Sequence, residues 1–341
     1  MYGTARIRAL ENRIVGREKL NALMEARGRE EILSRLAEYG VLSREGNNLS
    51  GGQTDRSGEA FSQAVEEALS GLLRDAYRDV EEAAPDGRGF VWFRYPYDCN
   101  NIKLAIKCRI RGIPEEEVRQ MLFDFGTVPP DGVLTAVREG DFRAFPPAMA
   151  AGATAAEEAY AKSSDPRQID TNLDKACYRD MLATAEESGD PTLLSWLRAK
   201  IDLLNAVICL RMLRIGQSDA GRSFLLDTLL PGGDLPLSLF TEAYDTGETF
   251  LWERLAASRY ASFARAAEKT GKTPADVERC ADDCWMSIVK EGARVAFGAP
   301  VLAGYLVGWE AAVKKIRMVL AAKEVGLDIA VIRERVGESY V

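Results

Sequence analysis

The chain of 341 residues contains no histidine. Without an imidazole it has no Ser–His–Asp triad, no Cys–His pair, no His-ligated zinc and no histidine proton shuttle. Cysteine is also scarce, and we expect its copies to be reduced and free of metal, because they are too scattered for a disulfide framework. They are Cys99, Cys108, Cys177, Cys209, Cys280 and Cys284. We therefore predict no catalytic residue, no cofactor and no metal ligand.

Long hydrophobic runs are also lacking. The most apolar window, 295–309, is bounded by Arg294 and Glu310 and interrupted by Pro300 and three glycines. It therefore falls short of the roughly 20 residues that a membrane-spanning helix needs. The N-terminal segment is charged throughout and predicts no export signal. The net charge of −8 disfavours sequence-independent binding to phosphate backbones. We expect a cytoplasmic protein with no nucleic-acid partner.

Helical periodicity of apolar residues recurs through most of the chain. It covers residues 5–24 and resumes after Gly28, which predicts an amphipathic helical hairpin. Pro114 and the three glutamates after it predict another helix, ending at Gly126, because proline fits the first turn and carboxylates complement the helix dipole. Strand-like alternation is absent except for a short stretch at 90–97. The sequence therefore predicts an all-α fold.

Loop-forming residues divide the chain into segments of similar length. The segment 45–57 is rich in Gly, Asn and Ser and should be an exposed connector. Further breaks are expected at 84–89, 129–132, 146–147 and 231–233. Similar segment lengths call for a search for internal repeats.

A polar motif recurs along the chain. It consists of Asp-x-x-Asn, a basic residue six positions after the Asn and a Gly eleven positions after the Asn. The first copy is Asp98, Asn101, Lys107 and Gly112, and the second is Asp202, Asn205, Arg211 and Gly216. A degraded third copy contains Ala312, Lys315, Arg317, Lys323 and Gly326. A helix-opening residue follows each glycine, namely Pro114, Ser218 and Asp328. We predict three helical repeats, at 59–165, at 166–270, and at 271–341 together with 1–58.

The motif residues allow more than one interpretation. Asp and Asn three positions apart share a helix face, where they can bind a metal or a neighbouring chain. We favour the alternative that each pair ties an adjacent helix within its repeat, because buried polar groups need partners. Nearby bases, Lys103, Lys107, Arg109 and Arg111 and then Lys314, Lys315 and Arg317, form either anion sites or, as we favour, ion pairs and solvated faces.

Two further patterns in the last repeat are weak. Cys280 and Cys284 share a helix face and could form half of a soft-metal site, but we prefer two buried small residues. Asp282 and Asp283 resemble the acidic start of the metal motif in all-α prenyl-transferring enzymes. Cys284 and Trp285 follow where another Asp is needed, so that enzyme class is rejected.

Several segments in order resemble one family, the C/d-type subunit of V-type and archaeal A-type rotary ATPases. They are TARIRALENRIVGREKL, YDCNNIKLAIKCRIRG, LDKACYRDML, IDLLNAVICLRMLR and the ending VLAGYLVGWEAAVKKIRMVLAAKEVGLDIAVIRERVGESYV. The resemblance extends over essentially the full chain. It departs at Ala312 and Lys315, where the family typically carries Glu and Asn.

The resemblance implies a helical funnel of three similar units about a pseudo-threefold axis. It also implies a non-catalytic central-rotor collar that links the central stalk of the soluble ATPase head to the membrane rotor ring. Ion transport would then be coupled to ATP hydrolysis or synthesis, with the chain peripheral on the cytoplasmic face of the membrane. The alternative is a freestanding helical adaptor or a small-ligand enzyme built on the same repeats.

Overall fold

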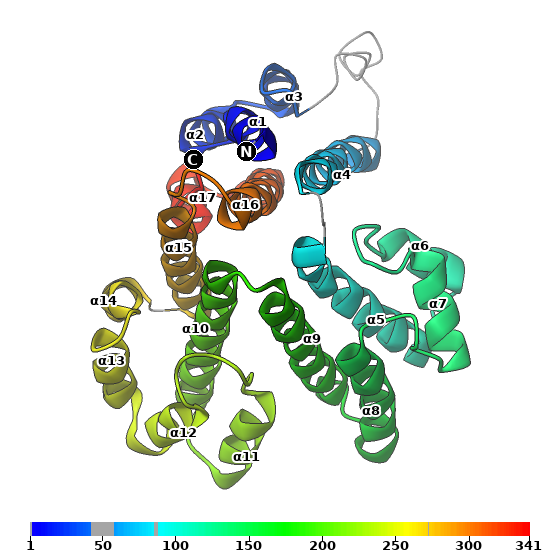
Figure 1. Ribbon diagram of the computed structural model, residues 1–341, viewed down its shortest axis with the longest axis vertical. Helices are drawn as coiled ribbons and strands as arrows, with labels where there is room; N and C mark the ends of the chain where they lie inside the picture. The colour runs from blue at the N-terminus through cyan, green and yellow to red at the C-terminus, as the bar shows by residue number, and fades with distance from the viewer. Residues whose placement is uncertain (1, 42–57, 85–87, 272) are drawn as a thin grey trace. The chain divides into compact units, whose positions relative to one another are not determined.

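The computed structural model describes residues 2–41, 58–84, 88–271 and 273–341, so the predicted connector at 45–57 lies outside the described residues. Every regular element among the described residues is a helix, which confirms the predicted all-α class (Figure 1). The chain divides into two compact units. We call residues 1–87 with 270–341 the terminal unit and residues 88–269 the central unit. The boundaries of the three repeats stay a prediction.

The central unit is arranged around one long helix, α9 (Arg167–Ser188), which packs against α5, α8 and α10 (Figure 1). Shorter helices cover α5 and α10 on their other sides. Besides α9, the unit contains η2 Arg88–Phe93, α5 Tyr95–Ile110, α6 Glu115–Met121, α7 Pro130–Glu139, α8 Pro147–Ser163, α10 Pro191–Ile215, α11 Asp219–Thr228, α12 Leu237–Thr246, α13 Glu248–Ala256 and α14 Ala261–Thr270.

The predicted breaks of the central unit lie at helix boundaries. The break at 231–233 falls between α11 and α12, whereas those at 129–132 and 146–147 extend into the first turns of α7 and α8. Proline explains this placement, because it fits the first turn of a helix but not its interior. Half of the break predicted at 84–89, residues 85–87, lies outside the described residues.

Helices α8 and α9 approach closely because small residues line their contact. A methyl group on Gly152 would lie only 2.5 Å from Cβ of Ala176. Asp180 of α9 accepts hydrogen bonds from the backbone N–H groups of Ala148 (3.0 Å) and Met149 (2.7 Å). These two groups are among the first-turn donors of α8 that have no partner within their own helix. The α8–α9 pair is therefore fixed both by packing and by a cap supplied from the neighbouring helix.

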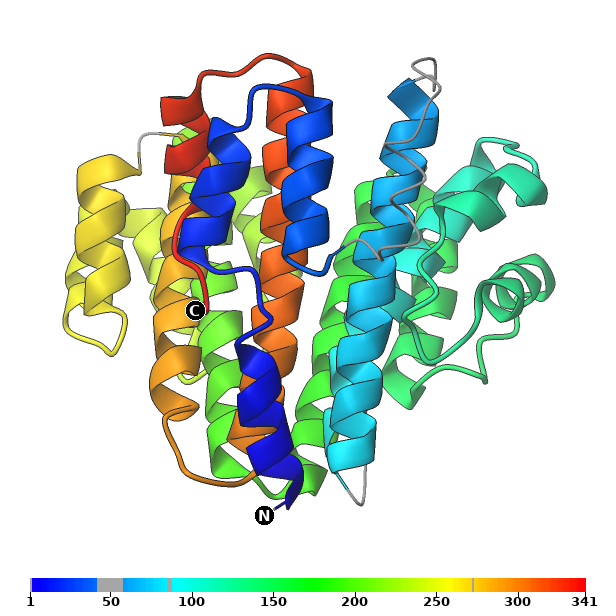
Figure 2. The same ribbon diagram turned by 90° about the horizontal axis from the view of Figure 1, so that it is seen from above.

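The terminal unit is built on α16 (Ala299–Glu324), whose residues 300–309 are all buried. It packs against α1, α2, α4, α15 and α17, and Figure 2 shows α4 and α16 side by side. Gly304 and Gly308 allow the Tyr340 ring to lie on this helix, since a methyl group on Gly308 would lie 2.7 Å from its Cδ1. The other helices of the unit are α1 Tyr2–Glu11, α2 Arg17–Glu25, α3 Arg29–Glu38, α4 Gly58–Ala83, α15 Pro274–Gly292 and α17 Ile329–Val336.

The predicted N-terminal hairpin is wrong in one respect, because residues 5–24 do not form one helix. The chain leaves helical geometry between Glu11 and Arg17, which separates α1 from α2. Arg17 N–H donates to the carbonyl oxygen of Val341 (3.3 Å), and a methyl group on Gly16 would lie 2.9 Å from that oxygen. The break therefore accommodates the distant C-terminal residue, which local periodicity does not encode.

The helix predicted after Pro114 begins as expected but ends earlier. It stops at Met121, which is half exposed, rather than at Gly126. Phe123 N–H donates to the side chain of Asn101, which takes the backbone out of helical geometry. The strand-like stretch 90–97 is also helical, because it forms the end of η2 and the start of α5.

Candidate functional site

The predicted helix-opening residues of the three motif copies are confirmed, and the motif glycines follow the ends of the long helices. Each long motif helix, α5, α10 and α16, is followed by a glycine with positive φ, a conformation that favours glycine. These are Gly112, Gly216 and Gly326, with φ of 70°, 119° and 71°. A short helix follows each glycine, and its N-cap is the expected residue, namely Pro114, Ser218 or Asp328.

The first Asp–Asn pair lies fully buried on α5 and holds the loop between α6 and α7. Asn101 Nδ2 donates to the carbonyl oxygen of Phe123 (2.8 Å), and Phe123 N–H donates back to Asn101 Oδ1 (2.9 Å). The Asp98 carboxylate accepts from the N–H groups of Thr127 (2.9 Å) and Val128 (3.2 Å) and from the Thr127 hydroxyl (2.6 Å). The pair thus ties a long helix to a loop that has no regular hydrogen bonding of its own.

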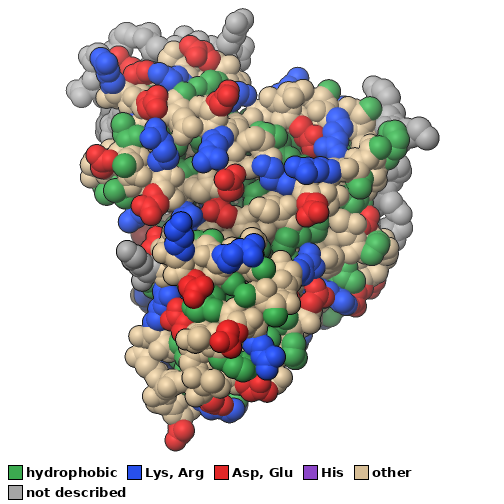
Figure 3. All heavy atoms as spheres, turned by 90° about the vertical axis from the view of Figure 1, so that its left-hand side faces the viewer, with side chains coloured by type: hydrophobic (Ala, Val, Ile, Leu, Met, Phe, Trp, Pro, Cys, Tyr) green, Lys and Arg blue, Asp and Glu red, His purple; other side chains and the backbone are tan. Residues whose placement is uncertain are grey.

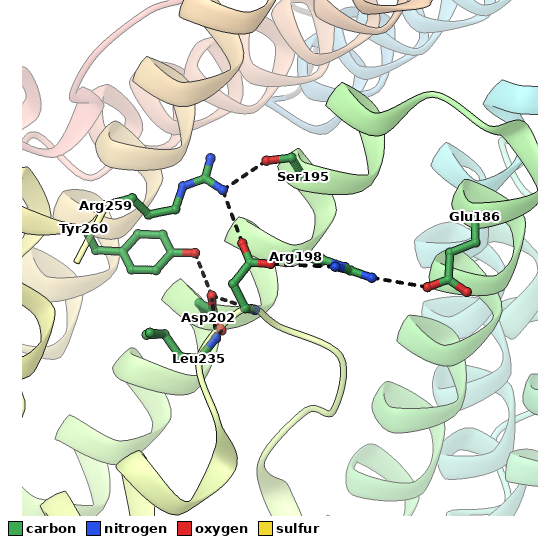
Figure 4. Close-up of polar contacts among 8 residues, drawn as sticks. Glu186, Ser195, Arg198, Asp202, Leu235, Arg259 and Tyr260 are labelled. Atoms are coloured by element: carbon green, nitrogen blue, oxygen red, sulfur yellow. Dashed lines mark hydrogen bonds and ion pairs between the residues drawn. The ribbon is translucent and has the colours of Figure 1, made fainter.

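The second pair repeats this arrangement on α10. Asn205 exchanges two hydrogen bonds of 2.8 Å with the backbone of Leu230, in the loop between α11 and α12. Asp202 accepts from the N–H groups of Asp234 (3.0 Å) and Leu235 (3.1 Å) and from the hydroxyl of Tyr260 (2.6 Å) (Figure 4). The two copies therefore bring equivalent side chains to equivalent loops, although the third donor to each carboxylate comes from a different place.

Burial raises the pKa of both motif carboxylates. The pKa of Asp98 is raised by desolvation, against the hydrogen bonds from Thr127 and Val128 that lower it. For Asp202 the same loss of hydration raises the pKa to about 6, against the hydrogen bonds from Tyr260, Leu235 and Asp234. In both places the loss of hydration disfavours the ionised carboxylate, and the hydrogen-bond donors offset that penalty in part.

Two loop glycines, which the sequence indicated only as a helix end (Gly126) and as part of a break (Gly233), lie against these carboxylates. A methyl group on Gly126 would overlap Oδ1 of Asp98, and one on Gly233 would overlap Oδ1 of Asp202. In each loop the residue after the glycine donates its N–H to the carboxylate. The sequence signal that could have identified these partners was a glycine after each short helix. It was not recognised because the two glycines lie at different distances along the chain from their motif aspartates.

A second layer of charge surrounds Asp202. Asp234 lies between two arginines, Arg259 at 3.2 Å and Arg198 at 3.9 Å (Figure 4). Arg198 also pairs with Glu186 of α9 at 3.4 Å. These side chains are partly exposed, so each pair contributes about 0.2–1 kcal/mol. The network connects α9, α10 and the segment before α14 around one loop.

Most of the predicted basic clusters form intramolecular ion pairs. The pairs are Lys103–Asp174, Lys107–Asp170, Arg109–Glu157, Lys314–Asp282 and Arg317–Glu66. Arg211, the base of the second motif, lies exposed on α10. On the face seen in Figure 3, basic and acidic side chains are likewise interspersed. The geometry is that of ion-paired helix faces rather than of a basic patch for an anion.

The third motif copy differs from the other two. Ala312 is buried and offers no polar group, and Lys315 is buried on α16. Desolvation lowers the pKa of Lys315 to about 8, while Asp283, Asp282 and Glu338 oppose that shift. A buried ammonium group thus occupies the motif position at which the other two copies carry an amide, and it faces carboxylates from α15 and from the C-terminal segment.

Other candidate chemistry is limited within the described residues. All six cysteines are buried and unbridged. No cluster of three or more acidic or cysteine side chains in the described ranges is placed to hold a metal ion. None of the described helices combines the length and the apolar character required to cross a bilayer.

The family follows from comparison with known proteins. The family model described as "ATP synthase (C/AC39) subunit" matches residues 4–335. The chain belongs to this family. The match confirms the resemblance to the C/d-type subunit of V-type and A-type rotary ATPases that the sequence motifs indicated.

This C/AC39 family member is similar to several archaeal proteins that are named as C subunits of A-type ATP synthases. The one from Thermococcus gammatolerans is 26% identical over 353 residues, which covers 99% of this chain and 89% of the relative. The one from Thermococcus kodakarensis is 25% identical over 351 residues, with 99% and 90% covered. The one from Methanocaldococcus jannaschii is 31% identical over 132 residues, with 38% and 31% covered.

Proposed function

We propose that this chain is the non-catalytic central-rotor collar of an A/V-type rotary ATPase. The observation that carries the proposal is the family match over residues 4–335, together with relatives named as A-type ATP synthase C subunits that align with 99% of the chain. The collar would bind central-stalk subunits on one side and the membrane rotor ring on the other. It would lie on the cytoplasmic face of the membrane and couple ion transport to ATP hydrolysis or synthesis.

The internal ties support a mechanical role. A part that transmits torque must resist deformation, and loops are normally the least stable parts of a helical protein. Here the loops after α6 and α11 are held by buried Asp–Asn pairs, with bonds of 2.6–3.2 Å from backbone and hydroxyl donors. In the proposed arrangement, three such units form a funnel about a pseudo-threefold axis. The motif residues stiffen each unit, and they neither perform chemistry nor bind a cofactor.

The test is binding to stalk subunits. The chain is co-expressed with the central-stalk subunits encoded by the same genome, and the purified material is analysed by size-exclusion chromatography with light scattering. We expect a stoichiometric complex, and no ATP hydrolysis by the isolated chain. Membranes that lack this protein should regain ATP-driven ion pumping when the chain is added back.

The competing hypothesis, a freestanding adaptor or small-ligand enzyme, makes the opposite prediction. It is favoured if the chain stays monomeric beside folded stalk subunits and pumping is not restored. The head subunits without the stalk serve as the control, because a rotor collar should not bind them.

A further inference from the structure

A glycine next to a carboxylate recurs at three loops of the protein. Gly126 lies against Asp98, Gly233 against Asp202 and, in the C-terminal segment, Gly337 against Asp283, where a methyl group would lie 2.5 Å from Oδ1. In all three places the next residue donates its backbone N–H to the same carboxylate. In the third place this donor is Glu338, at 2.7 Å. Each glycine also follows the short helix after a motif helix.

The third carboxylate comes from a different helix. Asp98 and Asp202 belong to the motif helices α5 and α10, whereas the corresponding position on α16 is Ala312. Asp283 instead belongs to α15, which packs against both α16 and α17. Arg279, one turn earlier on α15, contacts Oδ2 of Asp283 at 3.3 Å and leaves Oδ1 for Glu338 N–H.

We propose that Asp283 is the positioning residue of the third repeat and has taken over the role that Asp98 and Asp202 have in the other two. The loop-holding carboxylate has moved from the motif helix to α15, and the buried Lys315 fills the space of the missing amide. The segment 337–341 is then the third copy of the loops that Asp98 and Asp202 hold. The inference concerns this chain alone and does not depend on its partners.

The surroundings of Lys315 agree with the replacement of a carboxylate on α16 by Asp283 on α15. Its ammonium group faces Asp283 and Asp282 of α15 and Glu338 of the C-terminal segment, with Lys314 beside it on α16. A buried cation next to the relocated carboxylate balances a charge that an amide would leave uncompensated. A further hydrogen bond also fixes the segment 337–341, because Lys290 Nζ donates to the carbonyl oxygen of Ser339 at 3.1 Å.

The experiment measures hydrogen exchange at the Glu338 amide by NMR in the full chain. Asp283→Ala removes the acceptor, and we expect exchange at Glu338 to become at least about tenfold faster. Asp282→Ala is the matched control, because Asp282 is the adjacent carboxylate on α15 and pairs with Lys314 instead. The relocation variant Asp283→Ala, Ala312→Asp, Lys315→Asn restores the Asp–Asn pair to α16 and should recover slow exchange. Asp283→Asn gives a second, milder variant that keeps the side-chain volume.

The outcomes separate the possibilities. Fast exchange in Asp283→Ala, slow exchange in Asp282→Ala and recovery in the relocation variant support the proposal, with Asp283→Asn in between because its amide oxygen can still accept the Glu338 N–H as Asn101 and Asn205 accept theirs. If Asp283→Ala speeds exchange no more than Asp282→Ala does, Asp283 does not hold the segment. If the relocation variant stays fast while its circular dichroism is unchanged, Asp283 does not replace a motif carboxylate. Either of these two results overturns the proposal.

Discussion

At the residue scale, Asp202 combines complete burial with three hydrogen-bond donors. Tyr260 donates its hydroxyl, and Asp234 and Leu235 donate their N–H groups. Such donors stabilise an ionised carboxylate, yet the loss of hydration outweighs them and raises the pKa to about 6. The same residue therefore holds a loop and makes the stability of the protein depend on pH.

This pH dependence has a definite sign. Because the folded pKa of Asp202 lies above the ordinary value of 3.8, its contribution to the free energy of unfolding is fully present below about pH 4. The contribution is lost as the pH rises through 6, and by pH 7 the loss reaches about 3 kcal/mol. Asp202→Asn removes this titration. Urea unfolding at pH 4–7 should show wild type losing stability relative to Asp202→Asn, whereas parallel curves would contradict the assignment.

At the scale of helices and loops, local signals placed most boundaries correctly. Pro114, Ser218 and Asp328 begin their helices, since a cap acts within one turn and can be read from neighbouring residues. The break before α2 was missed because it accommodates Val341, from the other end of the chain. Of the site, the two Asp–Asn pairs were found through their fixed spacing. Their glycine partners and Asp283 were not, because loops of unequal length and a different helix supply them.

Two glycines in helices allow the effect of helix propensity to be compared with the effect of a tight helix–helix contact. Alanine is a better helix former than glycine by about 0.5–1 kcal/mol. At Gly71 of α4 a methyl group would meet nothing within 4 Å, so Gly71→Ala should stabilise by about that amount. At Gly152 the same methyl would press on Ala176 of α9, and Gly152→Ala should destabilise by about 1–3 kcal/mol.

Scanning calorimetry of both variants checks this pair of predictions. The transition temperature should rise for Gly71→Ala and fall for Gly152→Ala. An unchanged or higher transition temperature for Gly152→Ala would contradict the tight α8–α9 contact, and a lower one for Gly71→Ala would contradict the open space around Gly71.

At the scale of the whole molecule, polar and reactive groups lie inside both units. The terminal unit buries Lys315, and the central unit buries Asp98, Asp202 and Asp180. Each buried carboxylate accepts backbone N–H groups from another segment of the chain. The interior is thus held together by directed polar contacts as well as by apolar packing, as the proposed mechanical role requires.

The cysteines report on the integrity of this interior. They are distributed over both units, and every one is buried. Burial raises the pKa of Cys209 to about 12, and the neighbouring Cys99 thiol together with burial raises the pKa of Cys177 well above its ordinary value. Because the thiolate is the reactive form, the native protein at pH 8 should react only slowly with a disulfide reagent such as Ellman's. In guanidinium chloride, without reductant, the same reagent should titrate all six thiols of the chain. Rapid native labelling would place a cysteine at the surface, and fewer than six thiols after denaturation would reveal a disulfide or an oxidised side chain.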